Sequence, residues 1–158
     1  MSGETVRVIN LDEVEPQPHE HGEHFAAEFR QLGRPLGAEL LEPTRIHAPD
    51  VLALADALGT ALHAACHVTG GGLPGNLPRV MPEGLVAEVD DASWDLPPLF
   101  RWLAERGPVV DDELRRTFNC GVGMVAVVAP DAVDAAVDLL AGRGTPAWVL
   151  GRVGPARR

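Results

Sequence analysis

The sequence predicts an α/β (α+β) fold, a layered sandwich in which helices flank a mixed β-sheet. Its 158 residues suffice for one domain with a core of its own. Hydrophobic residues make up 46% of the chain, against 23% charged residues. From residue 38 onward, short apolar runs typical of strands alternate with stretches in which apolar residues recur at helical spacing. Such alternation is typical of helices packed on a sheet.

The first 37 residues have a different pattern from the rest. The segment VRVINL at 6–11 predicts a short strand. The acidic segment DEVEPQPHEHGEHF at 12–25 has neither helical nor alternating period, so we expect an exposed arm, closed by a short helix over 24–33. We therefore predict an arm over 1–37, a domain over 38–153 and a tail over 154–158.

Proline and glycine positions predict the elements of the first half of the domain. Pro43 opposes a regular helix, so residues 39–46 are expected to form a strand or a turn. Pro49 and Asp50 open a helix whose apolar positions continue at helical spacing to Leu62. A buried strand is expected over 65–69, ahead of a triple glycine. Short helical turns interrupted by prolines are then expected over 73–81.

The second half follows the same signals. Pro97 and Pro98 begin an amphipathic helix that Gly107 ends. A β-branched run over 124–129 indicates a strand buried on both faces. The remaining expected elements are strands over 85–89 and 146–153 and helices over 111–117 and 131–144.

Charge and composition exclude several classes of function. All 13 basic residues are arginine against 23 acidic residues, which gives a formal net charge of −10. A chain without lysine has no lysine nucleophile and no phosphate-binding P-loop lysine. The negative charge opposes binding to nucleic acid or anionic membranes. No apolar run approaches the ~20 residues of a membrane span, and no signal-peptide pattern is present, so we expect a cytoplasmic protein.

The segment CHVTGGGLPGNLPRVMP at 66–82 is the strongest local signal for a binding site. Three consecutive glycines leave backbone N–H groups unobstructed and allow positive φ, so the loop could fold around an anion. His67, Thr69 and Asn76 could donate hydrogen bonds, and Arg79 supplies positive charge suited to phosphate. From the spacing alone, a tight structural turn with a satisfied histidine is favoured over contact with a phosphate or another ligand.

A second glycine-rich segment, RRTFNCGVGMVAVV, covers 115–128. Asn119 could hydrogen-bond the loop backbone, while Gly121 and Gly123 permit close approach of a ligand or a neighbouring chain segment. A purely structural role is favoured for this segment, more strongly than for the first one. Cys120 is interpreted as a small buried apolar residue, since no basic neighbour pattern argues for a lowered pKa. Neither it nor Cys66 has the spacing of a metal or redox motif.

The histidines of the arm suggest a metal site. His19, His21 and His24 lie among glutamates, in an order that could place imidazoles on one side of an extended chain. No core element fixes a further ligand, so we favour solvated histidines and predict no metal site. The aspartates of the segment DAVDAAVDLL at 131–140 recur on one helix face and are expected to face water.

Several stretches taken together resemble one known family. HVTGGGLPGNLPRVMP at 67–82, W-x-x-P-x-x-F-x-W-L at 94–103 and RTFNCGVGM at 116–124 are similar to the C-terminal domain of aminoimidazole ribonucleotide synthetase, or phosphoribosylformylglycinamidine cyclo-ligase. LLEPTRI at 40–46 and PAWVLGRV at 146–153 match as well, so the resemblance covers about 36–153. Residues 6–38 instead resemble the opening strand and arm of small cupins, although no cupin barrel follows.

This resemblance implies a step of purine biosynthesis. ATP activates the formyl oxygen of formylglycinamidine ribonucleotide, the amidine nitrogen closes the imidazole ring, and ADP and phosphate leave. His67 matches the family histidine that faces the cleft between two domains and is implied to be catalytic. The residues implied to contact substrate or phosphate are Thr69, Gly70, Gly71, Gly72, Asn76, Arg79, Asn119 and Gly121. His47 stands where relatives usually have tyrosine.

The resemblance also implies ATP and Mg²⁺, but the family's nucleotide-binding N-terminal domain with its magnesium-binding aspartates does not occur in this sequence. We therefore expect the C-terminal half of a cyclo-ligase, inactive by itself, that forms a homodimer or pairs with a separate N-terminal-domain protein. The alternative is a noncatalytic phosphate-binding, nucleotide-binding or subunit-assembly module. A metal-dependent cupin-like protein is a third hypothesis, motivated only by the arm histidines.

Overall fold

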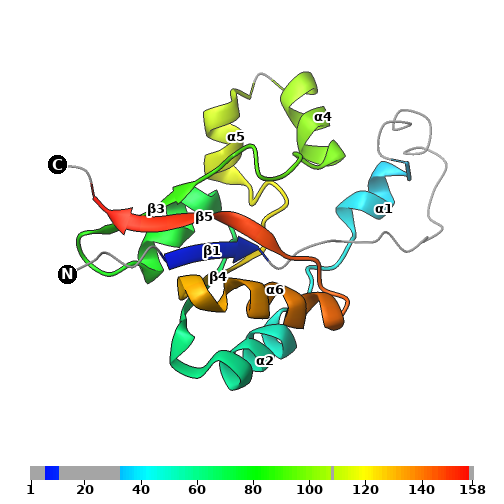
Figure 1. The fold of residues 1–158 in the computed structure, drawn as a ribbon. Helices are drawn as coiled ribbons and strands as arrows, with labels where there is room; N and C mark the ends of the chain where they lie inside the picture. Colours follow the sequence, from blue (N-terminus) through cyan, green and yellow to red (C-terminus); the bar gives the residue numbers. More distant parts are fainter. Residues whose placement is uncertain (1–5, 11–32, 108, 157–158) are drawn as a thin grey trace.

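The computed structural model describes residues 6–10, 33–107 and 109–156, and shows one β-sheet with helices on both sides (Figure 1). The strands are β1 (Val6–Asn10), β2 (Leu62–His67), β3 (Leu85–Val89), β4 (Met124–Val128) and β5 (Trp148–Pro155). The α-helices are α1 (Leu36–Leu40), α2 (Ala48–Leu58), α3 (Gly72–Asn76), α4 (Pro98–Arg106), α5 (Asp111–Thr117) and α6 (Val133–Gly142). Single 3₁₀ turns are η2 (Gly59–Ala61), η3 (Leu77–Val80) and η4 (Pro130–Ala132). The predicted α+β sandwich is confirmed.

The sheet is antiparallel throughout, so the prediction of a mixed sheet is wrong. Its strand order is β2-β4-β1-β5-β3, and all four neighbouring pairs are antiparallel. Helix α6 does connect two strands that run in the same direction, β4 and β5, as a βαβ unit would. Strand β1 lies between them and runs the opposite way. The alternation of helices and strands therefore predicted correctly that a helix connects β4 to β5, but it did not predict that β1 lies between these two strands.

Strand β1 was predicted, but its place in the middle of the sheet was not. Arg7 is in register with Val128 of β4 on one side and with Arg152 of β5 on the other. The prediction of an arm over 1–37 is therefore wrong for Val6–Asn10, which belongs to the same sheet as the rest of the domain. The predicted helix over 24–33 and the cluster of His19, His21 and His24 lie outside the described residues.

The core lies on both faces of the sheet, and β4 contributes to both. Val125 and Val127 pack with Leu73 and Leu77 of the α3–η3 side, whereas Ala126 and Val128 pack under helices α2 and α6. Burial of alternate residues on opposite faces follows from the period of two in a strand. The prediction that this run is buried on both faces is confirmed.

Local signals located most of the other elements, with two exceptions. β3 and α5 match their predicted bounds, and α4 begins at Pro98 and ends before Gly107 as expected. Helix α2, however, ends at Leu58, because Gly59 takes a positive φ of 53° and the chain turns into β2. A strand or a turn was expected over 39–46. Instead, the short helix α1 includes residues 39 and 40, residue 41 is a turn, and residues 42–46 form neither helix nor strand.

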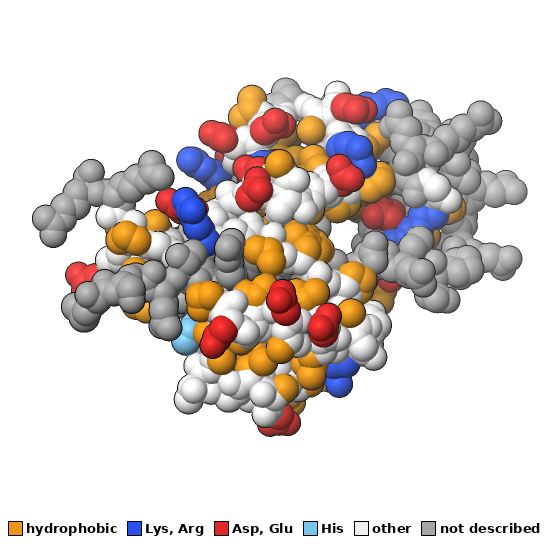
Figure 2. Space-filling model, in the orientation of Figure 1, with side chains coloured by type: hydrophobic (Ala, Val, Ile, Leu, Met, Phe, Trp, Pro, Cys, Tyr) orange, Lys and Arg blue, Asp and Glu red, His pale blue; other side chains and the backbone are white. Residues whose placement is uncertain are grey.

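The surface of α6 agrees with its sequence pattern. Asp131, Asp134 and Asp138 are exposed, as predicted. On the face shown in Figure 2, acidic side chains lie among apolar ones over this helix. In the part of the chain that the structure describes, no helix is long and apolar enough to cross a membrane.

Candidate functional site

The glycine-rich loop between β2 and α3 is built on two left-handed residues, Gly71 at φ 99° and Gly72 at φ 58°. Gly72 also packs directly against the end of α5. A Cβ atom at this position would lie 1.8 Å from the carbonyl oxygen of Arg115 and 2.7 Å from that of Phe118. Only glycine satisfies both the backbone conformation and the close approach. The triple glycine therefore fixes the loop against the second glycine-rich segment.

Asn76 closes this loop from inside. Its side chain is buried, and Nδ2 donates to the carbonyl oxygens of Thr69 at 3.3 Å, Gly70 at 3.2 Å and Gly72 at 2.9 Å. Its Oδ1 accepts from Thr69 Oγ1 at 3.5 Å and from Arg79 at 3.4 Å. The hydrogen-bonding capacity of Asn76 is used within the loop. This favours the tight structural turn for Asn76 over a direct contact with a ligand.

His67, Thr69 and Arg79 lie at the surface beside this loop. The His67 ring meets the ring of His47 edge-on, with centroids 5.9 Å apart and planes at 61°. His47 is buried at the start of α2. The predicted catalytic histidine is thus exposed but backed by a second imidazole, which restricts its orientation.

The second glycine-rich segment forms a loop after α5, held in an Asx turn. Asn119 Oδ1 accepts from the Gly121 N–H at 3.1 Å, and the Val122 N–H donates to the Asn119 carbonyl at 3.0 Å. Cys120 has φ 53° and Gly121 has φ 94°. A Cβ atom on Gly121 would lie 2.6 Å from Pro97 Cγ. Glycine is again required here by both conformation and space.

The two glycine-rich segments lie side by side. Besides the contact of Gly72 with α5, the Val68 N–H donates to the Gly123 carbonyl at 2.7 Å. The segment between β3 and α4 completes the arrangement, because Trp94 Nε1 donates to the Cys120 carbonyl at 3.0 Å. The motifs at 67–82, 94–103 and 116–124, which are far apart in the sequence, therefore form one surface.

Two cavities open on this surface. The larger, of about 750 Å³, lies between the 34–47 segment and the start of α4, and Asn119, Gly121 and Gly123 line it. The smaller, of about 260 Å³, is lined by Arg115, Arg116 and two aspartates among others. Asn119 and Trp94 line both cavities. Of the eight predicted contact residues and His67, only Asn119 and Gly121 line either of these two cavities.

Neither cysteine has the properties of a nucleophile. Burial raises the pKa of Cys66, which the charge of Arg79 offsets in part. Burial also raises the pKa of Cys120, offset in part by Arg115. Both thiols are buried and stay protonated at neutral pH, which confirms the interpretation of Cys120 as a small buried residue.

The described part of the chain has no ready-made site for magnesium, which the resemblance implies. Across residues 33–107 and 109–156, no group of three or more histidine, cysteine, aspartate or glutamate side chains is arranged to hold a metal ion. Mg²⁺ is commonly held by one or two carboxylates together with water and the phosphates of a substrate.

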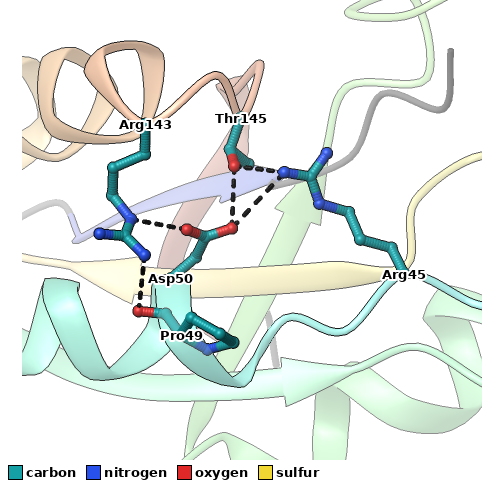
Figure 3. A network of polar contacts seen from close by, with 5 residues as sticks. All are labelled: Arg45, Pro49, Asp50, Arg143 and Thr145. Atoms are coloured by element: carbon teal, nitrogen blue, oxygen red, sulfur yellow. Dashed lines mark hydrogen bonds and ion pairs between the residues drawn. The ribbon is translucent and has the colours of Figure 1, made fainter.

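A buried polar network on the other side of the sheet was not predicted (Figure 3). Asp50 at the start of α2 accepts from Arg143 Nε at 2.7 Å and from Thr145 Oγ1 at 2.8 Å, and Arg45 lies 3.6 Å away. Burial by itself would raise the Asp50 pKa, but the bonds from Arg143 and Thr145 and the charges of Arg143 and Arg45 lower it. The network joins α2 to the turn between α6 and β5.

Trp94, Arg115 and Asp91 are the residues of the loop surface that sequence reasoning missed. Arg115 Cζ lies 5.6 Å from the centroid of the Trp94 ring, and Arg115 also pairs with Asp91 at 2.9 Å. Trp94 begins the W-x-x-P motif, which was the available signal. The motif marked the residue, but its bond to a loop 26 positions away could only be seen in the fold.

Comparisons with known proteins place the chain in one family. Residues 9–158 match the family described as AIR synthase related protein, C-terminal domain. A Streptomyces fradiae protein provisionally named phosphoribosylformylglycinamidine cyclo-ligase is 52% identical over 126 residues, which are 80% of this chain and 68% of that protein. The phosphoribosylformylglycinamidine cyclo-ligase of Sorangium cellulosum is 52% identical over 77% of this chain. That of Methylobacillus flagellatus is 47% identical, also over 77%.

The matched region is only part of the last two relatives. It spans 35% of the Sorangium cellulosum protein and 34% of the Methylobacillus flagellatus protein. The family match from residue 9 includes Ile9 and Asn10 of β1 and the segment up to residue 38.

Proposed function

Because the chain belongs to the family of AIR synthase related C-terminal domains, we propose that it is the C-terminal half of a phosphoribosylformylglycinamidine cyclo-ligase. In this reaction ATP activates the formyl oxygen of formylglycinamidine ribonucleotide. The amidine nitrogen then attacks the activated carbon and closes the imidazole ring, while ADP and phosphate leave. The chain contributes substrate contacts and does not turn over by itself.

The observation that supports this proposal is the meeting of the two glycine-rich motifs on one surface. Gly72 packs on the carbonyl oxygens of Arg115 and Phe118, so the motif around His67 and the motif around Asn119 share one wall. Phosphoryl transfer depends mainly on positioning and charge. Exposed His67, Thr69 and Arg79 would contact the substrate from this wall, and the backbone of 70–72 would support them.

ATP and Mg²⁺ would be bound largely by the rest of the enzyme. The described part of this chain offers arginines but no cluster of carboxylates for a metal. We assign ATP binding to the assembled enzyme. A cytoplasmic location and dimer formation are likewise proposed for the assembled enzyme. This chain's share is Arg79, Arg115 and Arg116, whose charge favours an anionic substrate.

A second function, as an assembly module without catalysis, is favoured by one specific observation. Leu40, Leu41 and Ile46 are 62%, 72% and 79% exposed, and they lie within one short segment. Exposed apolar side chains gathered in this way mark a contact surface. If the chain is the C-terminal half of a cyclo-ligase, the same segment would contact the N-terminal half. The two proposed functions therefore both include assembly and differ only in whether catalysis follows.

The test is reconstitution. The region of the Sorangium cellulosum relative that matches this chain is replaced by the 122 residues of this chain that match it, and the chimera is assayed for ATP-dependent ring closure of formylglycinamidine ribonucleotide. We expect turnover by the chimera and none by the 158-residue chain alone. His67→Ala in the chimera should lower kcat by about 100-fold or more, as expected for a group that contacts the reacting phosphate.

Two results would contradict the proposal. Turnover by the chain alone would show that no second half is needed. A folded chimera without activity, beside an active parent enzyme, would favour the assembly module instead. Gly75→Ala in the chimera is the control for His67→Ala. Gly75 lies in α3 next to the same loop, and its Cβ position has open space around it, so this variant should keep its activity.

A further inference from the structure

We propose that Trp94 is a positioning residue for the loop 118–121. Its indole N–H holds the Cys120 carbonyl and thereby directs the side-chain amide of Asn119 to the point where the two cavities meet. The proposal rests on the proposed function, and it adds that the substrate extends from the surface beside His67 into the cavities that Asn119 lines. It concerns a residue that does not itself contact the reacting atoms.

The loop needs an external support because its backbone is strained. Cys120 and Gly121 are consecutive left-handed residues, and Cys120 is the one non-glycine with positive φ among the described residues. A side chain with a Cβ atom pays a steric cost in this conformation. The Trp94 hydrogen bond, 3.0 Å long, is made to the carbonyl of this residue. The bond therefore acts on the position where the loop would otherwise relax.

Trp94 is itself held on several sides. Its ring packs against the core cluster that contains Leu73 and Val122. On another side, Arg115 lies 5.6 Å from the ring centroid, within cation–π range, and Asp91 fixes Arg115 through a 2.9 Å ion pair. A side chain fixed in this way can hold a loop at a defined position.

The consequence for Asn119 follows from its hydrogen bonds. The Gly121 N–H can only donate, so the atom of Asn119 that it meets at 3.1 Å is the oxygen Oδ1. The Nδ2 amide group is then not the one that faces the Gly121 N–H, and Asn119 lines both cavities. An amide donor at this place suits an acceptor oxygen, either of a phosphate or of a carbonyl group. Moving the Cys120 carbonyl would rotate this donor out of place.

Trp148 provides a matched control. Its ring packs against the same core cluster as Trp94. Its Nε1 is buried and has no hydrogen-bond partner among the described residues. Trp148→Phe therefore removes an indole N–H without removing a hydrogen bond, whereas Trp94→Phe keeps a ring beside Arg115 and removes only the bond to Cys120.

The first measurement is amide hydrogen exchange by NMR on the 158-residue chain. We expect Trp94→Phe to raise the exchange rate of the Gly121 amide by about 5-fold or more, which corresponds to one lost hydrogen bond. The side-chain amide resonances of Asn119 should shift as well. Trp148→Phe should leave both unchanged. Equal exchange at Gly121 in the two variants would overturn the proposal.

The second measurement uses the chimera described above. Trp94→Phe should lower kcat/KM by about 10-fold, the loss of one positioned hydrogen bond to substrate. If Trp94 acts through Asn119, the Trp94→Phe/Asn119→Ala variant should be no slower than Asn119→Ala alone. Additive losses would overturn the proposal. An inactive chimera with unchanged Trp94 would contradict the proposed function, and the exchange measurement would still decide the role of Trp94.

Discussion

At the scale of single residues, Gly72 is the position where the two motif loops touch most closely. Gly72→Ala would place a Cβ atom 1.8 Å from the Arg115 carbonyl oxygen, in a backbone conformation of φ 58°. Backbone on both sides must then move, so we expect the free energy of unfolding to fall by about 2–4 kcal/mol. Urea unfolding followed by circular dichroism measures this.

Gly75→Ala is the control for this substitution. It lies in the same helix, with nothing within 4 Å of its Cβ position. Alanine should be neutral there or stabilise the helix by up to ~1 kcal/mol. Similar losses at both positions would show that the close packing on α5 is not the cause.

Asp50 predicts a pH dependence of stability. Its folded-state pKa is lower than that of the unfolded chain, so its contribution is present above the unfolded pKa of about 3.9 and is lost as the pH falls through the lower folded value. At pH 7, Asp50→Asn should cost about 1–2 kcal/mol, because it removes the charge that pairs with the partly exposed Arg143 and weakens the acceptor of buried Thr145.

Unfolding titrations at several pH values check this second prediction. The gap between the original chain and Asp50→Asn should narrow as the solution is acidified below about pH 4. Asp138→Asn, an exposed aspartate on α6, should show little difference at any pH. A gap that stays constant into strong acid would mean that the charge of Asp50 is not what stabilises the network.

Residue-scale inference from the sequence succeeded where a local rule applies. The triple glycine and Gly121 were expected to adopt positive φ or permit close approach, and Gly71, Gly72 and Gly121 do so. The individual partners of Asn76 could not be predicted, because its three carbonyl acceptors are close only after the loop has closed. The Asp50 network was equally out of reach, since Arg143 and Thr145 are more than 90 positions away.

At the scale of elements, prolines and glycines fixed the boundaries that could be predicted. Pro98 starts α4 and Gly107 follows its end, and the run Leu85–Val89 alternates as a strand should. Helix α2 was predicted too long because Leu62 continues its apolar spacing. Periodicity could not separate the end of a helix from the start of a strand after a short turn, and the strand predicted to be buried is the half-exposed edge strand β2.

Strand β1 yields the third prediction. A chain of residues 6–158 keeps every described element, whereas a chain of residues 11–158 lacks the strand between β4 and β5. Both neighbours would then have unpaired backbone groups inside the sheet, which is costly and favours aggregation. We expect cooperative thermal unfolding for 6–158 and none for 11–158. Equal melting curves would show that β1 does not hold the sheet together.

At the scale of the whole molecule, the segment around α1 gives the fourth prediction. Replacing Leu40, Leu41 and Ile46 with serine should leave the melting temperature of the chain within a few degrees, because these side chains are mostly exposed already. The activity or the assembly of the chimera should fall, since apolar contacts across the new interface are lost. A triple variant with full activity would exclude this segment from the interface.

The arrangement of the site shows how far sequence reasoning extends at this scale. The motifs predicted which stretches belong to a functional surface, and the fold places those stretches together through Val68, Gly72 and Trp94. The sequence pattern could not predict the strand order, because the neighbours of a strand in a sheet depend on long-range packing and not on local pattern. The antiparallel insertion of β1 is therefore a property of the whole chain.

The position of β1 has a consequence for how the protein reaches this structure during synthesis. Val6–Asn10 is synthesised well before its partners Met124–Val128 and Trp148–Pro155. Such distant pairings carry a large loop-closure entropy and slow folding. The sheet therefore closes only after Trp148–Pro155 has been synthesised, and until then the nascent chain needs protection from other chains that offer a free strand.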